Sequence, residues 1–356
     1  MNWLIYGANG YTGRLLAREA VRQGLRPVLA GRSAASIQGL ASELGLESQV
    51  FGLDDPVELA RHLEDCRLVL HCAGPFAATS QPMIAACLAA RVHYLDITGE
   101  IEVFANAQRQ SDAASRADVV LLPGVGFDVV PSDCLAATLV RALPAAIELV
   151  LAFEAGGGPS PGTAKTSLER LGAGGMIRRD GLLTVVPLAY KSRLIPFAHG
   201  ERMAVTIPWG DVYTAFVSTG VPNVEVYMAL SPERIKRLRR LRWVQGLLAT
   251  RPVRNFLQKR VARTVKGPSE SRRDSTACQL WGEARSADGR SVTATMTTPN
   301  GYDLTVAAAL GVARFLLEHQ VEGGYYTPSL LLGPDFARSL PGVVMALGSV
   351  TQTRSD

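Results

Sequence analysis

The sequence of 356 residues lacks the patterns that cross-link chains or bind metals. Its five cysteines are odd in number and widely spaced, with no C-x-x-C pair, and its five histidines form no H-x-x-x-H motif or cluster with carboxylates. Disulfide frameworks and zinc sites depend on such patterns. We therefore expect reduced thiols in a cytosol and no metal site.

Long apolar runs are missing as well. Nowhere do eighteen apolar residues follow one another, and the N-terminus enters a strand-like run without a charged and then apolar leader. Membrane-spanning helices and signal peptides require these features, so we expect a chain that is neither membrane-spanning nor secreted. With 47% hydrophobic and 19% charged residues, the chain is long and apolar enough for two domains with cores of their own.

A strand, a glycine turn and a helix open the chain. Residues 3–6 are apolar, glycines follow at 7, 10 and 13, and an amphipathic pattern begins after them. Glycines let a turn approach a pyrophosphate closely, and the helix start offers N–H groups and partial positive charge to it. The G-x-x-G-x-x-G spacing differs from the standard fingerprint, so an ordinary structural turn stays an alternative. The cofactor-binding residues predicted here are Gly7, Asn9, Gly10, Tyr11, Thr12 and Gly13.

The second strand-like run, residues 26–30, ends in Gly31, Arg32 and Ser33. An NAD-dependent enzyme would place Asp or Glu there to bond the ribose hydroxyls, whereas an arginine accommodates the 2′-phosphate of NADP. Arg32 and Ser33 therefore predict NADP(H) as the cofactor. The alternative is that Arg32 is a solvated arginine at the start of the next helix.

Helices and strands alternate through the first 135 residues. Residues 67–72 form an almost unbroken apolar run, which is typical of a parallel strand covered on both faces. Ligands of doubly wound sheets lie beyond the carboxyl ends of the strands, so we expect the turn that follows to lie against the nicotinamide half of the cofactor. The residues of that turn are Ala73, Gly74, Pro75 and Phe76.

From residue 146 the pattern of the sequence changes. Alternating or β-branched segments are separated by joints rich in glycine and proline, and a single helix is expected among them at 164–171. This pattern predicts a second sheet that is largely antiparallel. The segments lie at 147–153, 182–186, 203–207, 212–218 and 224–230.

Four motifs of the first 135 residues together resemble the saccharopine dehydrogenase-like oxidoreductases, and two later segments continue the likeness. The motifs are the glycine turn at 7–13, CAGPF at 72–76, HYLDITGE at 93–100 and PGVGFD at 123–128, followed by Pro131 and Asp133; the later segments are TPNGY at 298–302 and GYYTP at 324–328. The family also includes the trans-acting enoyl reductases of mycobacterial lipid synthesis, whose domain plan is similar.

The resemblance and the patterns imply an α/β fold in which a Rossmann-type doubly wound parallel sheet precedes a second α+β domain built on a mostly antiparallel sheet. We expect an NADP-binding domain at 1–135 and a substrate or interaction domain at 136–302 with basic helices at 234–266. C-terminal helices at 303–356 are expected to return to the Rossmann domain.

Reduction by hydride transfer also needs a source of protons. The Y-x-x-x-K pair of short-chain dehydrogenases is absent, because neither Tyr94 nor Tyr302 has a lysine four residues on. For Asp96 and Glu100 the alternative is structural: Asp96 would cap the next turn and Glu100 would bond backbone amides. The predicted catalytic residues are Tyr94, Asp96, Glu100, Lys165 and Tyr302.

A net charge of +5 hides a strongly basic segment at 234–273, which holds 14 Lys/Arg against one acid and leaves 23 bases against 31 acids elsewhere. Two amphipathic basic helices separated at Pro252 are predicted there. They would contact an anionic membrane or an acidic carrier protein, or else their apolar stripes pack on the second domain and their arginines are solvated. Nucleic acid is not expected, since no aromatic or base-reading motif accompanies the charge.

We therefore expect an NADP-dependent oxidoreductase, acting as a reductase on a small-molecule or carrier-bound, lipidic substrate, as in trans-acting enoyl reduction. Saccharopine itself is not the expected substrate. It carries several carboxylates, and the second domain has few suitably placed arginines outside its basic segment to bind them. The alternative function is a non-catalytic nucleotide-binding scaffold on a membrane or synthase surface. The expected location is cytoplasmic; attachment at a membrane surface and a homodimer stay open.

Overall fold

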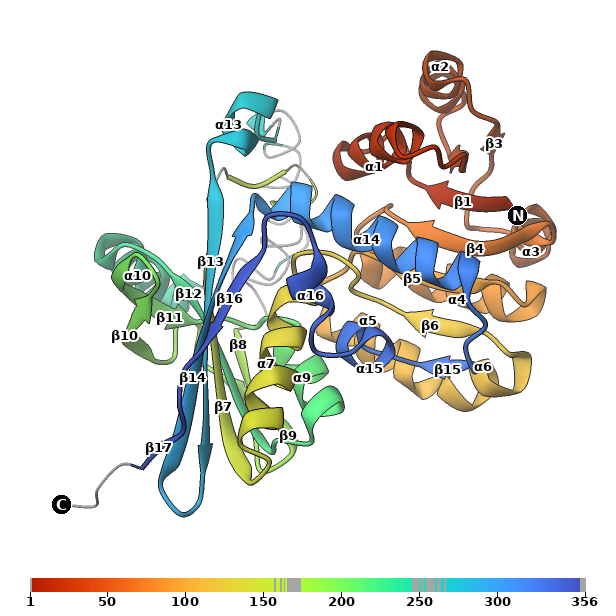
Figure 1. Cartoon of the computed structure of the whole chain (residues 1–356). Helices are drawn as coiled ribbons and strands as arrows, with labels where there is room; N and C mark the ends of the chain where they lie inside the picture. Colours follow the sequence, from red (N-terminus) through yellow and green to blue (C-terminus); the bar gives the residue numbers. More distant parts are fainter. Residues whose placement is uncertain are drawn as a thin grey trace. The chain divides into compact units, whose positions relative to one another are not determined.

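A computed structural model of the protein describes residues 2–156, 158–160, 162, 164, 174–244, 250, 253, 260, 264–265 and 267–352. The chain divides into two compact units, which are drawn in Figure 1. Unit 1 consists of Met1–Asp128 and Tyr302–Leu331, and unit 2 consists of Val129–Gly301 and Leu332–Asp356.

Unit 1 contains a seven-stranded parallel sheet in the order β15-β6-β5-β4-β1-β2-β3. The chain runs outward from β1 through β2 to β3 and then returns to β4 on the other side of β1. This reversal makes the carboxyl ends of β1 and β4 the switch point of the sheet, where doubly wound sheets bind ligands. The strands are β1 Asn2–Tyr6, β2 Val28–Gly31, β3 Ser48–Val50, β4 Cys66–His71, β5 His93–Asp96, β6 Val120–Leu122 and β15 Gly324–Tyr325.

Helices flank this sheet, as Figure 1 shows. Contacts link α1 with α2 and, separately, α3 and α6 with α4, so the helices form two groups. The parallel sheet with flanking helices confirms the predicted Rossmann-type fold. The helices are α1 Tyr11–Arg22, α2 Ala34–Leu44, α3 Pro56–Leu63, α4 Phe76–Ala90, α5 Ile101–Arg109, α6 Ser111–Ala117, α14 Gly301–Glu318 and α15 Pro328–Leu332.

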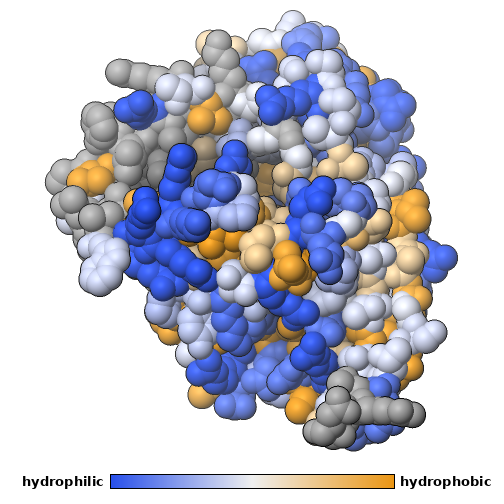
Figure 2. Space-filling view, turned by 90° about the vertical axis from the view of Figure 1, so that its left-hand side faces the viewer, coloured by the Kyte–Doolittle hydropathy of each residue, from blue (hydrophilic) through white to orange (hydrophobic). Residues whose placement is uncertain are grey.

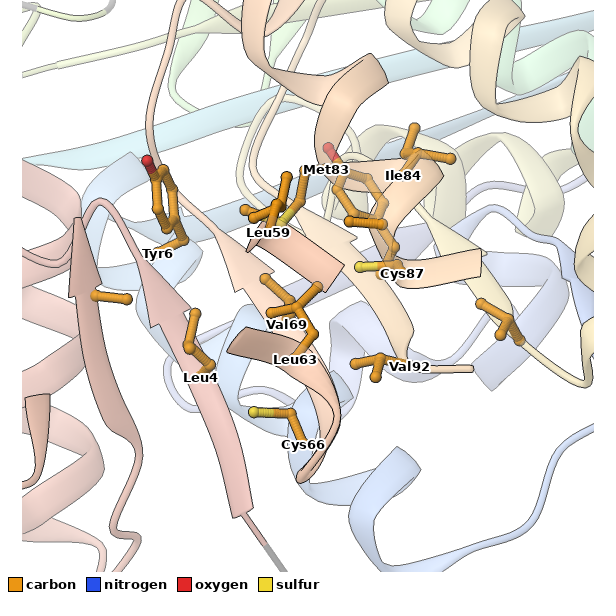
Figure 3. Packing of buried hydrophobic residues seen from close by; sticks show 14 of the residues in the cluster. Leu4, Tyr6, Leu59, Leu63, Cys66, Val69, Met83, Ile84, Cys87 and Val92 are labelled. Carbon is orange, nitrogen blue, oxygen red and sulfur yellow. The ribbon is translucent and has the colours of Figure 1, made fainter. Parts of the chain in front are cut away.

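Both faces of the parallel sheet are buried. Successive side chains of a strand point to opposite faces, and along β1 Leu4 and Tyr6 alternate with Trp3 and Ile5, all at most 2% exposed. On one face, shown in Figure 3, strand residues pack against α3 and α4. The labelled members of this cluster are Leu4, Tyr6, Leu59, Leu63, Cys66, Val69, Met83, Ile84, Cys87 and Val92.

Unit 2 is built on a ten-stranded sheet whose main path runs β10-β11-β12-β7-β13-β14-β16. Every pair in it is antiparallel except β12 with β7, which confirms the prediction of a mostly antiparallel second sheet. The strands are β7 Ala146–Glu154, β8 Gly175–Arg179, β9 Leu182–Val186, β10 Ser192–Phe197, β11 Gly200–Thr206, β12 Asn223–Ala229, β13 Ala277–Ser286, β14 Arg290–Pro299, β16 Val344–Leu347 and β17 Thr351–Gln352.

Helices α7 and α9 pack against each other, and α7 also contacts β7, β13 and β14. No helix among the described residues is long and apolar enough to cross a bilayer. The helices of unit 2 are α7 Val130–Ala142, α9 Asp211–Thr219, α10 Pro232–Leu241, the 3₁₀ turn η1 Arg242–Val244, α13 Glu270–Asp274 and α16 Phe336–Ser339.

The predicted strand at 212–218 is wrong, because this segment is helix α9. Its β-branched residues resemble a strand, but its buried residues include Asp211, Thr214 and Ala215, which share one face of a helix. Gly220 ends the helix in a left-handed conformation that favours glycine. Most of the helix predicted at 164–171, and most of the second basic helix, lie outside the described residues.

The last part of the chain is divided between the units. Tyr302–Leu331 belongs to unit 1, where β15 pairs with β6, whereas Leu332–Asp356 belongs to unit 2. Both β16 and β17 pair with β14 of the second sheet. Only the first part of the segment 303–356 therefore lies with the parallel sheet.

Candidate dinucleotide-binding site

The turn between β1 and α1 is packed so closely that side chains are excluded from it. Gly7 has φ +80°, and a Cβ on it would lie 2.8 Å from the backbone nitrogen of Ala73 in the loop after β4. A Cβ on Gly13 would lie 2.4 Å from the carbonyl oxygen of Gly7. The amides of Gly7 and Ala8 both donate to the carbonyl of Ala30, at 2.8 and 3.2 Å. The turn is therefore held to β2 and against the loop after β4.

Helix α1 begins at this turn with an end that suits an anion. Gly10 is its N-cap residue, no side chain in this fully described helix caps the first turn, and no acidic residue lies there. Tyr11 and Thr12 are the first two residues of the helix, and Arg14 Nε donates to the carbonyl of Asn9 at 3.1 Å. An uncapped N-terminus carries partial positive charge and N–H donors, which suit a pyrophosphate.

Arg32 lies directly after β2 and is exposed. No ion pair joins it to a carboxylate of the described residues, and its charge acts on Tyr6, where burial raises the pKa and Arg32 opposes the shift. Ser33 is the N-cap residue of α2 and its hydroxyl donates to Ser36 Oγ at 3.1 Å. A guanidinium beside a hydroxyl at the end of β2 can bind a phosphate.

The loop after β4 is anchored by the buried His71 and the partly buried Thr79. Thr79 Oγ1 donates toward the carbonyls of Ala73 at 2.7 Å and Pro75 at 3.1 Å, and it lies 2.9 Å from His71 Nε2. Because the hydroxyl proton is directed at these carbonyls, His71 Nε2 is the donor to Thr79. Burial lowers the pKa of His71 to about 3, so the ring is neutral. Gly74 lies within this loop.

Glu100 fixes the start of α4. Its two carboxylate oxygens accept from the backbone amides of Phe76 at 3.1 Å and Ala77 at 2.8 Å, and only 7% of the residue is exposed. A carboxylate at the positive end of a helix stabilises that helix. Pro75 is the N-cap residue and cannot cap the helix with a side-chain hydrogen bond, which Glu100 compensates.

Asp96 ties β5 to the loop after β6. Its carboxylate accepts from the Tyr94 hydroxyl at 2.7 Å and from the amides of Thr98 at 2.9 Å and Gly124 at 2.8 Å. Burial raises the pKa of Asp96 to about 7, although these hydrogen bonds oppose the shift. Burial and the nearby Asp96 also raise the pKa of Tyr94. Both side chains are fully buried and have no solvent contact. Their hydrogen-bond partners are groups of the protein itself.

Tyr302 lies beside the glycine turn. Its ring meets that of Tyr11 edge to face, with 4.9 Å between the centroids. The same helix, α14, is joined to the loop after β6, since Thr305 Oγ1 accepts from the amide of Phe127 at 2.9 Å. Unit 1 thus brings together Tyr302 and the predicted cofactor residues of the turn, whereas Lys165 lies outside the described residues.

The residues present fit a dinucleotide. The glycine turn is packed too closely for a Cβ at positions 7 and 13, and the start of α1 suits a pyrophosphate. Arg32, which has no ion pair with the carboxylates that the structure describes, lies at the end of the neighbouring strand. For a metal the described residues offer little, because no group of three or more His, Cys, Asp or Glu side chains gathers among them.

Sheet order, glycine turn and switch point together define a dinucleotide-binding domain of the Rossmann class. Comparison with known proteins adds a family likeness. Residues 3–122 match the family described as the saccharopine dehydrogenase NADP binding domain. The match confirms the predicted resemblance and, through the family's description, the predicted cofactor NADP(H).

Among curated proteins, the chain is 31% identical over 142 residues to the trans-acting enoyl reductase of Mycobacterium tuberculosis, which is 36% of this chain and 33% of that protein. The trans-acting enoyl reductase of Mycobacterium leprae is 31% identical over 140 residues, with the same shares. The chain thus spans about a third of the length of the curated relatives it matches.

Among solved structures, saccharopine dehydrogenase (L-Glu forming) from Saccharomyces cerevisiae superposes with a TM-score of 0.67 at 13% sequence identity. The superposition covers 98% of this chain and 100% of that chain. At this identity the likeness establishes a common fold and nothing about the reaction. Because the superposition covers 98% of this chain, the common fold includes both units.

Thr79 and Gly124 hold the site's loops together, and the sequence analysis missed both. Thr79 lies in the first turn of α4 and contacts the preceding loop, while Gly124 donates to Asp96 of another strand. For Thr79 the local signal is a threonine near a helix start, because its hydroxyl can bond nearby carbonyls. For Gly124 there is no local signal, because the pairing of β5 with β6 decides that its amide meets Asp96.

The buried Asp96 carboxyl predicts a pH effect on stability. Its pKa is about 7 in the folded protein and 3.8 ordinarily, so the folded state holds a proton that the unfolded state releases between these values. This contribution is complete below about pH 4 and is lost as pH rises through about 7, by at most about 1.4 kcal/mol per pH unit. We expect Asp96→Asn to flatten the slope of the unfolding free energy over this range.

The measurement is urea unfolding at a series of pH values, with Asp65→Asn at an exposed carboxylate as the matched control. The asparagine amide oxygen still accepts from both backbone amides, so the loops keep their hydrogen bonds. An Asp96→Asn slope equal to that of the wild type and of the control would contradict the assignment.

Proposed function

We propose that this protein is an NADPH-dependent reductase whose cofactor lies at the carboxyl ends of β1, β2 and β4. The observation that carries the proposal is the close contact of Gly7 with Ala73, which leaves no room for a side chain at position 7 where the two loops meet. NADPH would supply a hydride when bound there. The family match of residues 3–122 supports the same cofactor.

Residues at the ends of three strands of unit 1 would bind different parts of the cofactor. The start of α1, with Gly10 and Thr12, takes the pyrophosphate, and Arg32 with Ser33 takes the 2′-phosphate. The loop at Ala73–Phe76 lies along the nicotinamide half, and His71 with Thr79 keeps it in place. A rigid loop there orients the reacting face of the ring.

The hydrogen bonds favour positioning roles for three of the predicted catalytic residues. Tyr94 and Asp96 are buried and bond each other, and Glu100 is engaged by two backbone amides, so all three support loops at the cofactor edge. Tyr302 is only partly buried and contacts Tyr11 of the turn, which favours a role in covering the cofactor. Lys165 stays a prediction from the sequence.

We propose an α,β-unsaturated acyl thioester as the substrate class. The support is the similarity to trans-acting enoyl reductases, which covers 36% of this chain. The reduction adds a hydride to the β-carbon and a proton to the α-carbon, and so saturates the double bond.

Arg32 gives a test of cofactor choice. Replacing Arg32 by Asp removes a charge-assisted contact with the 2′-phosphate and repels it, so we expect NADPH binding to weaken by about 1–3 kcal/mol while NADH binding improves relative to it. Calorimetric titration of both coenzymes measures the ratio. Arg116→Asp, at an exposed arginine of the same unit, is the control for charge. An unchanged NADPH/NADH ratio in Arg32→Asp would remove the assignment of the 2′-phosphate to Arg32.

A substrate test uses trans-2-decenoyl-CoA with NADPH deuterated at the transferred position. We expect loss of the absorbance of reduced nicotinamide and one deuterium at the β-carbon of the decanoyl product, as read by mass spectrometry. Decanoyl-CoA, which has no double bond, should cause no oxidation. If NADPH binds but decenoyl-CoA remains unreduced, the enoyl assignment is contradicted while the cofactor site stands.

A further inference from the structure

Helix α10 and the turn η1 form a basic segment whose apolar side is already used inside unit 2. Ile235 is 4% exposed and packs with Ala189 and Val205, and Leu238 packs against the same cluster. Part of the apolar stripe predicted for this helix is therefore covered by the unit's own residues. The helix cannot insert that stripe into a bilayer or into the groove of another protein.

Two arginines fix the orientation of this segment. Arg239 Nη2 donates to Ser192 Oγ at 2.9 Å, and Arg242 Nη2 donates to the carbonyl of Ala189 at 2.6 Å. Both partners belong to the segment that leads into β10. Because these contacts and the buried Ile235 hold one side of the segment, the opposite side must face solvent.

The outward side carries cations and one bare indole ring. Trp243 is 92% exposed, and no ion pair joins the cations to a carboxylate of the described residues. Figure 2, which views the molecule from the side on which Figure 1 draws α10, shows a large hydrophilic area. We name the exposed set the basic tryptophan surface; it consists of Arg234, Lys236, Arg237, Arg240 and Trp243, and Arg239 and Arg242, which bond unit 2, lie at its edge.

Part of this surface is hollowed. Arg239, Arg240, Arg242 and Trp243 line a partly open cavity of about 380 Å³. Guanidinium groups bind phosphate oxygens in pairs of parallel hydrogen bonds. Arg239 and Arg242 already donate to unit 2 through Nε and Nη2, so the guanidinium of Arg240, with Nη1 of the other two arginines, suits a phosphate group. An indole ring beside them is amphipathic and favours the headgroup layer of a bilayer.

We propose that the basic tryptophan surface docks unit 2 on a bilayer that contains anionic phospholipid. Headgroup phosphates would lie among the guanidinium groups, and Trp243 would enter the interfacial layer. A protein partner would be expected to meet an apolar, shape-complementary patch, whereas Ile235 and Leu238 of this helix are packed inward. A lipid surface demands only charge and an interfacial aromatic side chain.

The test is co-sedimentation of the full-length protein with two kinds of vesicle. One contains phosphatidylcholine alone, and the other contains in addition about 30% phosphatidylglycerol, which gives it a negatively charged surface. We expect binding to the anionic vesicles only, weakened by salt. Arg237→Gln/Arg240→Gln should weaken it by about tenfold or more, since each basic residue near such a surface contributes roughly a fivefold factor. Trp243→Ser should weaken binding but keep its salt dependence.

Arg116→Gln/Arg179→Gln is the matched control, because it removes the same charge from exposed arginines outside the surface. Circular dichroism and thermal unfolding check that each variant is folded, and these readouts do not depend on docking. Equal loss in the control pair, equal binding to both vesicle types, or no binding would overturn the proposal. So would saturable binding of inorganic phosphate or polyglutamate without vesicle binding, which would assign the surface to a free anion or to an acidic protein.

Discussion

The close packing of two loops, at Gly7 after β1 and Ala73 after β4, is the constraint on which the site of unit 1 depends. A Cβ at position 7 would lie 2.8 Å from the nitrogen of Ala73, so only glycine fits at this position. The strand order reverses between the same two strands, so the contact lies at the switch point of the sheet. A turn without side chains at positions 7, 10 and 13, at a switch point and next to the start of α1, suits a pyrophosphate. Cofactor binding, and the reaction proposed from it, follow from this one contact.

Buried polar side chains maintain that geometry. Glu100 holds the start of α4, Asp96 joins β5 to the loop after β6, and His71 acts through Thr79 on the loop after β4. Each hydrogen bond places a loop at the carboxyl edge of the sheet. Removing such a partner would leave buried donors unsatisfied, which usually costs about 1–3 kcal/mol per group. The acidic residues of this edge therefore hold its loops in place.

Local patterns sufficed for the parts of the fold that local physics decides. The glycine turn and the apolar run of β4 indicated the parallel sheet, because close backbone approach and two-sided burial leave direct marks on composition. The segment at 212–218 was assigned to a strand because β-branched residues are common to strands and buried helices. The positions of β16 and β17 and the Asp96–Gly124 hydrogen bond depend on which strands pair, so residues far apart in the sequence decide them. The family resemblance anticipated the cofactor, whereas the roles of individual site residues remain proposals.

A crystal structure of the full chain with NADPH tests the central claim most directly. The account predicts the pyrophosphate at the first turn of α1, the 2′-phosphate within hydrogen-bond distance of Arg32, and the nicotinamide ring beside Ala73–Phe76. A coenzyme bound elsewhere, or a switch point at Gly7 filled by side chains while the coenzyme is present in excess, would contradict it.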